Sequence, residues 1–522
     1  MTVHETDVQL AVGASREAAA TVVEDGERVY MNGVRRVAVI GAGVGGLLAA
    51  RFVKQELGAQ LETLRVFEQR DDIAGTWIYS EDTGPRPAFP SAATLPPYGQ
   101  WPPTQSPVYA NLLTNLPIAL MALHDRPFAA TLPDYPSYTE VLAYWRQYAE
   151  DYQLNQHIRL RTRVELVTPA AENTDGHTMS WTVTLRNLDT SAADSSTSEQ
   201  TADVWQEQFD AVIVCNGHYQ EQFVPAIPGL QVLATQFPQR SVLVIGNGPS
   251  AFDIVRDLRP HVSRLIRCIR NVPLTDEFKG LSGTVLVPEI TRIFTGEAIS
   301  QIPSDALLHA KEDADFGPQA RIEIAKPQSE QIWLGLSDQR VVPAPDVLLL
   351  ATGYRYTFGF LPWLRDDLSD GHQPAVLAAD GASCHNLCYQ LYYTNMPSLS
   401  FIGLPKMVSP FPLMERQAWH VASVLAGRCC LPPQHERERT AHSEEEAGRD
   451  RLRGWHSLDG PAEWEYSDRL VTKVRTDPRR QRLEAERTDQ ERIGESWPDL
   501  VPEWWKNMRQ NARALRREAI GI

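Results

Sequence analysis

Two glycine-rich turns are the residues in this chain with the clearest chemical meaning. The first reads Gly41-x-Gly43-x-x-Gly46 and follows the apolar run VAVI. Gly41 permits a tight turn, Gly43 lets the backbone approach a pyrophosphate, and Gly46 lets the following helix pack closely on the strand. Because the N-terminus of such a helix carries positive potential, the pattern predicts a dinucleotide site.

Glu68 strengthens this interpretation of the first turn. It ends the next apolar run, LRVFE. At the end of the second strand of a strand–helix–strand unit, a carboxylate can accept hydrogen bonds from both hydroxyls of a ribose. A glycine triplet alone could be an ordinary turn. The strand, the helix and the terminal acid together indicate a nucleotide site.

The second turn, Gly246-x-Gly248, follows the apolar run SVLVI and has Ala251 at the third position, where alanine is tolerated. No acid ends the next strand, which instead carries three arginines, Arg264, Arg267 and Arg270. An arginine can pair with a 2′-phosphate that an acid would repel, so this unit favours NADP over NAD. Any one of the three could belong to a solvated surface. We expect Arg270, at the strand end, to reach the phosphate.

Two dinucleotide units in one chain imply one tightly held redox cofactor and one exchangeable nucleotide donor. That combination is typical of flavoprotein reductases and monooxygenases. Each unit reads as strand, turn, helix and strand, the first over residues 35–68 and the second over residues 241–270. This order predicts a parallel sheet in each. The string DVLLLATGYRYTF predicts a further buried parallel strand.

Other segments are predicted from local patterns. Tyr138 to Tyr152 has the pattern of a helix, and IRLRTRVELV and WTVTLRN have those of strands. Eight prolines between Glu81 and Tyr109 predict a long surface excursion. The Ser/Thr/Asp-rich stretch from Thr190 to Thr201 predicts a flexible hairpin tip.

Composition bounds the class of protein. The chain has 522 residues, a net charge of −16 and six cysteines. The negative charge argues against nucleic acid or an anionic membrane as the main partner. No apolar run is long enough to cross a membrane, and the first ten residues do not resemble a signal peptide. Few cysteines fit a reducing compartment, so we expect a cytoplasmic enzyme without a transmembrane anchor.

Six strings in order carry a family resemblance: GAGVGG, FEQRDDIAGTW, YANLLTNLPIALMALHDRPF, GNGPSAFD, LLLATGY and FPLMERQAWHVASVLAG. Together they resemble the class B flavin-containing monooxygenases, from about residue 35 to residue 431. The resemblance implies that NADPH reduces a bound FAD. The reduced flavin then traps O₂ as a C4a-hydroperoxide, which oxygenates nitrogen or sulfur of a small organic molecule, as in specialised metabolism.

The resemblance also implies site residues. FAD would be held by Gly41, Gly43, Gly46, Glu68, Thr76, Trp77 and the Thr114–Asn115 pair, and NADP by Gly246, Gly248, Ser250, Ala251, Phe252 and Asp253, with Arg270 at the 2′-phosphate. Asn115 would be the catalytic residue, in contact with both FAD and the oxidised nicotinamide nucleotide. An amide can donate to a peroxide oxygen without supplying an acidic proton that would release H₂O₂.

The implied fold is α/β, with two doubly wound, Rossmann-like dinucleotide-binding domains and the NADPH domain inserted in a discontinuous FAD domain. The expected boundaries are a flexible tail at 1–34, the first FAD part at 35–230, the NADPH domain at 231–339, and the second FAD part at 340–522. This last part includes a charged, helical C-terminal extension. The assembly is left open, with a homodimer as one possibility.

Three features depart from the family pattern. Ala74 stands where a doubled glycine usually precedes the tryptophan. The identifying string FxGxxxHxxxY is absent before the second turn, and no apolar C-terminal anchor is present. Since the family ties that string to nucleotide handling, efficient coupling of NADPH oxidation to oxygen transfer is in question.

Alternative functions stay open at this point. The same flavin chemistry could insert oxygen beside a ketone, as in Baeyer–Villiger oxidation, or the chain could be an oxidase-like or sensing flavoprotein without oxygen transfer. The vicinal pair Cys429–Cys430 lacks the spacing of a disulfide reductase. Cys384, His385 and Cys388 lack a fourth metal ligand, so no metal site is predicted.

Overall fold

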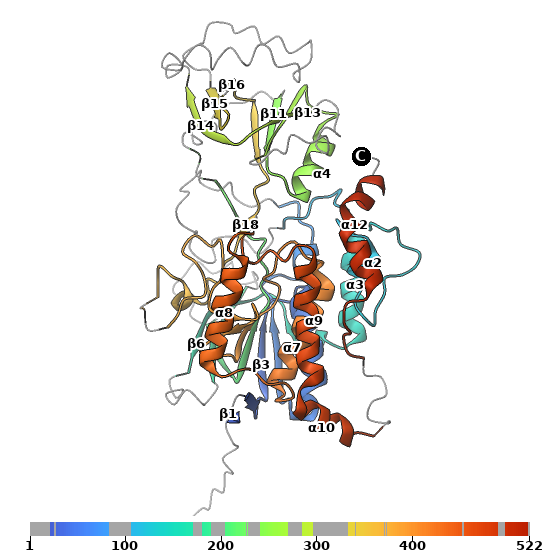
Figure 1. Cartoon of the computed structure of the whole chain (residues 1–522), viewed down its shortest axis with the longest axis vertical. Coiled ribbons are helices and arrows are strands. Elements are labelled where there is room, and N and C mark those ends of the chain that lie inside the picture. The colour runs from blue at the N-terminus through green and yellow to red at the C-terminus, as the bar shows by residue number, and fades with distance from the viewer. Residues whose placement is uncertain are drawn as a thin grey trace, which may run out of the picture.

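The computed structural model is a mixed α/β protein (Figure 1). It describes residues 21–25, 28–82, 106–170, 180–188, 204–225, 227, 241–269, 284–295, 332–339, 341–369, 371, 373–451, 454–488 and 496–519. The proline-rich stretch after Asp82 and the hairpin tip predicted at Thr190–Thr201 lie outside these residues, as does much of 270–331.

The larger sheet combines strands from distant parts of the chain. Its order is β19-β20-β21-β9-β3-β4-β5, and the run from β21 to β5 is parallel. The strands are β3 (Arg36–Ile40), β4 (Thr63–Phe67), β5 (Ile158–Arg159), β9 (Ala211–Val214), β19 (Leu387–Cys388), β20 (Tyr392–Tyr393) and β21 (Leu399–Phe401).

The central strand β3 shows why this sheet is buried on both faces. Val37 and Val39 belong to one core cluster, with residues of α1 (Val44–Leu57) and α7 (Pro410–Leu425). Ala38 and Ile40 belong to another, with the antiparallel sheet β6-β7-β8. Successive side chains of a strand point to opposite faces, so a continuous apolar run is what a sheet covered on both sides requires. The three covering strands are β6 (Thr162–Pro169), β7 (Trp181–Asn187) and β8 (Val204–Phe209).

The second dinucleotide unit forms its own parallel sheet, in the order β13-β12-β11-β17. Its elements are β11 (Ser241–Ile245), α4 (Pro249–Leu258), β12 (Arg264–Cys268), β13 (Thr284–Val287) and β17 (Val347–Leu350). A small antiparallel sheet lies beyond it, of β14 (Ile290–Thr295), β15 (Ile332–Leu336) and β16 (Val341–Pro343). The predicted α/β fold class with two dinucleotide-binding units is confirmed.

The domain boundary predicted between residues 339 and 340 is wrong. Strand β17 pairs in parallel with β11, so the second unit continues through Leu350. The two connections to the larger sheet then run side by side, because β10 (Glu221–Gln222) pairs with β18 (Tyr354–Arg355). β17 is the parallel strand expected in LLLATGY, although its residues are half-buried rather than buried.

The flexible tail predicted over residues 1–34 also needs correction. β1 (Thr21–Asp25) and β2 (Arg28–Asn32) form an antiparallel pair. Val29 is buried and exchanges two backbone hydrogen bonds with Leu431, at 2.8 and 2.9 Å. The contact joins residues about four hundred positions apart, so no local sequence pattern reveals it. The sequence therefore indicated order only from Arg35.

Further helices lie outside the two dinucleotide units. In the chain, α2 (Ile118–Met121) and α3 (Tyr138–Asp151) lie between β4 and β5, and α3 is one residue shorter than predicted. The C-terminal extension is helical, as expected, with α8 (Gln434–Gly448), α9 (Pro461–Thr476), α10 (Pro478–Glu486) and α12 (Glu503–Ala519). Among the residues that the structure describes, no helix is both long enough and apolar enough to span a bilayer.

A buried carboxylate joins three of these helices. Glu56 of α1 is fully buried and accepts hydrogen bonds from Trp419 and Ser423 of α7, at 2.7 and 2.9 Å. It also pairs with Arg480 of α10 at 2.8 Å and with Arg428 at 3.1 Å. A buried carboxylate must be both paired and hydrogen-bonded, and this one is.

We therefore expect Glu56→Gln to destabilise the fold. Among the described residues, the change leaves the buried Arg480 with Glu484, at 3.6 Å, as its carboxylate partner. Removing one partner of a buried ion pair costs about 3–5 kcal/mol. The matched control is Glu62→Gln, whose exposed pair with Arg35 contributes less than about 1 kcal/mol. Urea unfolding of both variants measures the difference; equal losses would contradict the role given to Glu56.

Candidate functional site

One cavity of about 1540 Å³ reaches both glycine-rich turns. Its wall includes, from the first unit, Gly41, Gly43 and Glu68, and from the second, Gly246, Gly248 and Ser250. Thr76, Trp77, Thr114 and Asn115 line it as well. Most of the residues predicted to bind the two cofactors therefore face one chamber. Gly46, Ala251, Phe252 and Asp253 are not part of its wall.

The first turn has the geometry that its spacing predicts. Gly41 has φ +99°, and a Cβ there would lie 2.6 Å from the carbonyl oxygen of Cys215. A Cβ at Gly46 would lie 1.9 Å from the carbonyl oxygen of Gly41. Only glycine fits at either position. Gly43 begins α1 as its N-cap, so the backbone N–H groups of the first helical turn point toward the cavity end of the unit.

Glu68 lies beside this turn and is buried. Its two carboxylate oxygens accept hydrogen bonds from the backbone N–H groups of Ala42, at 2.8 Å, and Arg70, at 2.9 Å. Burial raises the pKa of Glu68, and the two backbone donors oppose that shift. The carboxylate is thus held in a fixed orientation at the cavity wall, where a ribose could donate to its remaining lone pairs.

The segment Ala74–Trp77 closes over the first turn. Ala74 is fully buried and adopts φ +78°, the left-handed conformation that the family's usual glycine takes without cost. Its N–H donates to the carbonyl of Ala42 at 2.9 Å. Alanine at this position therefore holds a left-handed backbone at a cost of about 1–2 kcal/mol.

Thr114 and Asn115 differ in what they contact. Thr114 is buried and its hydroxyl donates to the carbonyl of Leu116 at 2.9 Å, while its N–H donates to Pro136 at 3.0 Å. Asn115 is exposed to the cavity. Within the described part of the chain its amide has no hydrogen-bond partner, so it is available to a ligand.

The second turn repeats the constraint of the first. Gly246 has φ +143°, and a Cβ there would lie 2.2 Å from the carbonyl oxygen of Ala351. At Gly248 a Cβ would meet nothing within 4 Å. Gly248 is the N-cap of α4, and Pro249 and Ser250 follow it on the cavity wall.

The next residues of α4 have partners inside the protein. The guanidinium of Arg267 stacks on the Phe252 ring at 3.9 Å and donates to the Asn247 side chain at 2.8 Å. Asp253 is buried and pairs with Arg516 at 3.0 Å, and it accepts from the Tyr109 hydroxyl. These contacts could not be predicted from local patterns, because Arg516 and Tyr109 are remote from Asp253 in the chain. Arg270 lies outside the described residues.

Two residues that the sequence did not single out also line the cavity, His218 and Lys406. Burial and the nearby Lys406 charge lower the pKa of His218 to about 3, so His218 is neutral at physiological pH. Lys406 lies over the Tyr356 ring at 4.1 Å, and burial lowers its pKa. His218 directly follows the CNG string at the end of β9, a strand-end position that could have marked it.

A second missed feature is the array Ser383–His385–Glu445, which also lines the cavity. Nδ1 of His385 lies 3.0 Å from Glu445 and Nε2 lies 2.6 Å from the Ser383 hydroxyl. A carboxylate only accepts, so Nδ1 donates; in the neutral ring Nε2 then accepts from Ser383. The His385 ring, close in sequence to Cys384 and Cys388, therefore has both nitrogens engaged.

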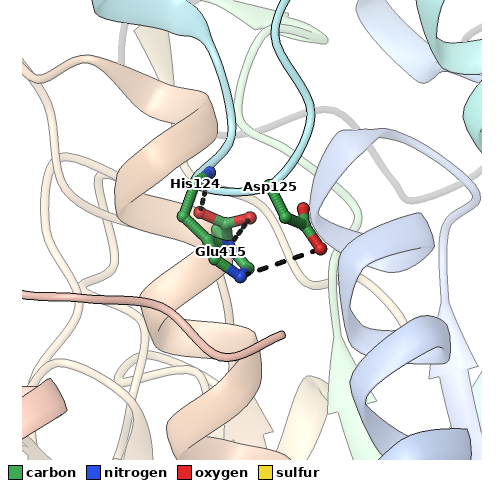
Figure 2. Close-up of side chains that lie close together, drawn as sticks. All are labelled: His124, Asp125 and Glu415. Atoms are coloured by element: carbon green, nitrogen blue, oxygen red, sulfur yellow. Dashed lines mark hydrogen bonds and ion pairs between the residues drawn. The ribbon is translucent and has the colours of Figure 1, made fainter. Parts of the chain in front are cut away.

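His124, Asp125 and Glu415 form a compact group outside the cavity wall (Figure 2). Nδ1 of His124 lies 2.8 Å from Glu415 of α7, and its Nε2 lies 2.9 Å from Ser496. Asp125 pairs with the buried Arg51 of α1. Because arginine already neutralises Asp125 and both ring nitrogens of His124 are engaged, we interpret the group as a structural link between helices rather than a metal site.

Comparisons with known proteins fit this geometry. A family model described as flavin-binding monooxygenase-like matches residues 34–271. Flavin-containing monooxygenase FMO GS-OX-like 7 of Arabidopsis thaliana is 30% identical over 425 residues, 77% of this chain and 76% of the relative. This chain belongs to the flavin-containing monooxygenase family. The predicted family is confirmed, and the protein is an FAD-dependent monooxygenase that uses FAD and NADPH.

Solved structures agree on the fold. S-allyl-L-cysteine S-oxygenase from Allium sativum is 25% identical and covers 93% of both chains with a TM-score of 0.65. Tmm from Pelagibacter sp. strain HTCC7211, at 16% identity, covers 92% of this chain and 90% of its own with a TM-score of 0.59. The second likeness concerns the fold alone. The glycine turns that exclude a Cβ leave room for a dinucleotide backbone, and the fixed Glu68 carboxylate can accept hydrogen bonds from a ribose. These features fit the two dinucleotides of this family.

The two glycines of the second turn should respond differently to alanine. Gly246→Ala places a Cβ against the Ala351 carbonyl, so we expect a lower unfolding midpoint and loss of NADP⁺ binding. Gly248→Ala meets no protein atom and should leave the midpoint unchanged. It should still weaken NADP⁺ binding, because the added methyl stands where a pyrophosphate approaches the backbone. Thermal unfolding and NADP⁺ titration of both holoenzymes measure this; full NADP⁺ affinity in Gly248→Ala would contradict the assignment.

Proposed function

We propose that this monooxygenase catalyses NADPH- and O₂-dependent oxygenation of a soft nucleophilic atom in a small organic molecule. Sulfur of a thioether is the favoured target, and nitrogen of an amine is the alternative. The proposal includes the first glycine unit with Glu68 as the FAD site, the second unit as the NADPH site, and Asn115 as the catalytic residue.

The observation that carries the proposal is the single cavity that both glycine turns share with Asn115. Hydride transfer requires the nicotinamide and the flavin to meet, and both cofactors can enter this chamber from the two turns. Bound FAD, once reduced by NADPH, supplies the chemistry that activates O₂. The protein's own part is to hold the two cofactors, admit the substrate, and control protons around the reacting oxygen.

Two cavity residues suit that control of protons. The free amide of Asn115 can donate a hydrogen bond to an oxygen anion but is not acidic enough to give up its proton. His218 is neutral at physiological pH, because burial and Lys406 lower its pKa, and so it holds no readily released proton. Residues that keep their protons, such as these two, support oxygen transfer over release of H₂O₂.

The similarity of this chain to a known S-oxygenase favours sulfur as the target atom. The Allium sativum enzyme is an S-allyl-L-cysteine S-oxygenase, and its chain aligns with this one over 93% of both lengths. A thioether also needs no deprotonation before it attacks an electrophilic oxygen, whereas an alkylamine is protonated at neutral pH. A sulfur nucleophile therefore needs one proton transfer fewer than an amine, which supports it as the target.

The function is tested by incubating the FAD holoenzyme with NADPH and a matched panel of thioethers, amines and ketones. NADPH consumption, oxygenated product and H₂O₂ are measured together. We expect sulfoxide formation that accounts for most of the NADPH consumed. Ester products from ketones would support Baeyer–Villiger oxidation instead, and H₂O₂ equal to the NADPH consumed with every compound would indicate an oxidase.

Asn115 should govern coupling more than binding. In Asn115→Ala, flavin reduction by NADPH should persist, while the fraction of NADPH yielding H₂O₂ should rise, since loss of a single oxyanion donor costs about 10²–10³-fold in the step that it serves. Asn111→Ala, on the same segment and exposed, is the control. Product and peroxide yields per NADPH check the prediction; unchanged coupling in Asn115→Ala would remove the proposed role.

Arg270 remains our proposed contact to the 2′-phosphate. Arg267 is already engaged by Phe252 and Asn247, which leaves the phosphate to another cation. In Arg270→Ala the KM for NADPH should rise by about 10- to 150-fold, the loss of a charge-assisted contact of about 1.5–3 kcal/mol. The KM for NADH should hardly move. Steady-state kinetics with both nucleotides decides: parallel losses would mean that the arginine is structural.

A reducing compartment such as the cytoplasm is the proposed location. All six cysteines are free, and five of them are buried. Proteins of oxidising compartments more commonly use their cysteines in disulfides, so this usage supports the proposal.

A further inference from the structure

The C-terminal helix α12 is fixed at its first half to the elements around the larger sheet. Trp505 donates from its indole N–H to the carbonyl of Leu120 at 3.3 Å. Arg509 pairs with the buried Glu463 at 2.8 Å and donates to the carbonyl of Met407 at 2.7 Å. These contacts hold α12 beside α2 and α9.

The second half of α12 is fixed to the other unit. Arg516 donates to both carboxylate oxygens of Asp253, at 3.0 and 3.1 Å, and Asp253 is on α4. The Tyr109 hydroxyl donates to the same carboxylate, and Arg256 lies 3.3 Å from it. Figure 1 shows α12 rising from beside α2 toward α4. The helix therefore bridges the two units that bind the two dinucleotides.

Arg513 of α12 and the start of α4 line the same cavity. Arg513 precedes Arg516 by three residues on α12, and Ser250 precedes Asp253 by three on α4. Residues three apart on a helix share a face. Both Arg513 and Ser250 line the cavity, each about one helical turn from the Arg516–Asp253 pair. Among the described residues none forms an ion pair or hydrogen bond with the Arg513 side chain, which is exposed.

We propose that Arg513 is part of the NADPH site, where its guanidinium binds the diphosphate at the N-terminus of α4. The proposal rests on the assignment of the second glycine turn to NADPH. The N-terminus of α4 offers a diphosphate its positive potential and the N–H of Ser250, since the N–H groups of Ala251 and Phe252 donate to Gly248. An arginine offers a planar fork that matches phosphate oxygens. On this account Asp253 does not contact the nucleotide. It positions α12, through Arg516, so that Arg513 reaches the cavity.

The diphosphate assignment has a consequence that separates Arg513 from Arg270. NADPH and NADH share the diphosphate and differ only in the 2′-phosphate. Loss of Arg513 should therefore weaken both nucleotides to the same degree. Loss of Arg270 should weaken NADPH alone.

The experiment is a calorimetric titration of the oxidised FAD holoenzyme with NADP⁺ and, separately, with NAD⁺. Arg513→Gln should raise both dissociation constants by about 10- to 100-fold, the loss of one charge-assisted contact. Arg513→Lys should recover part of the affinity. Arg517→Gln is the matched control, because Arg517 is exposed on the same helix but does not line the cavity. It should bind both nucleotides as the unaltered protein does.

Three results would overturn the proposal: unchanged affinities in Arg513→Gln, a loss for NADP⁺ alone, or an equal loss in Arg517→Gln. The second would assign the arginine to the 2′-phosphate, and the third would trace the effect to the helix as a whole. If NADP⁺ binding is unchanged but thioether affinity falls, the arginine belongs to the substrate. None of these titrations depends on oxygen transfer, so they stand apart from any failure of the proposed oxygenation.

Discussion

This structure depends on one steric constraint: at the first glycine of each turn, a backbone carbonyl leaves no room for a side chain. At the first glycine of each turn, a side chain would collide with the residue that follows the neighbouring parallel strand. The carbonyl of Cys215 excludes it at Gly41, and the carbonyl of Ala351 excludes it at Gly246. Each contact forces the chain to turn sharply at the carboxyl end of its sheet, where helix N-termini and strand ends meet. Because both sheets present that end to the same chamber, two local constraints produce one shared cavity.

Much of this arrangement could be predicted from the sequence because its causes are local. A strand, a glycine turn, a helix and a second strand occupy about thirty consecutive residues, and Glu68 follows directly after them. Asn115, which the family strings singled out, lines the cavity. The position of Ala74 shows the limit of such strings: the residue departs from the family, yet the buried backbone keeps the left-handed geometry.

What the sequence could not predict comes from partners far apart in the chain. The β1–β2 pair depends on Leu431, and the end of the second unit depends on β17 returning to β11. Asp253 matched a nucleotide-contacting string, but its partner is Arg516. His385, in a loop at the cavity wall, hydrogen-bonds to Glu445 on α8. No periodicity or short motif encodes such pairs, since each needs the complete fold to bring its two residues together.

The larger sheet also has a consequence for how the protein is made. Strand β21 lies next to β9 and completes the parallel core, but the whole second unit lies between them in the chain. During synthesis the strands β3, β4 and β9 must therefore wait, with an open edge at β9, until residue 401 has left the ribosome. An exposed edge of buried, apolar strands is prone to aggregation. The elements of the second unit other than β17 are consecutive in the chain and are synthesised during this interval. We expect yields of this enzyme to depend on chaperone supply and translation speed more than on the final stability of the native state.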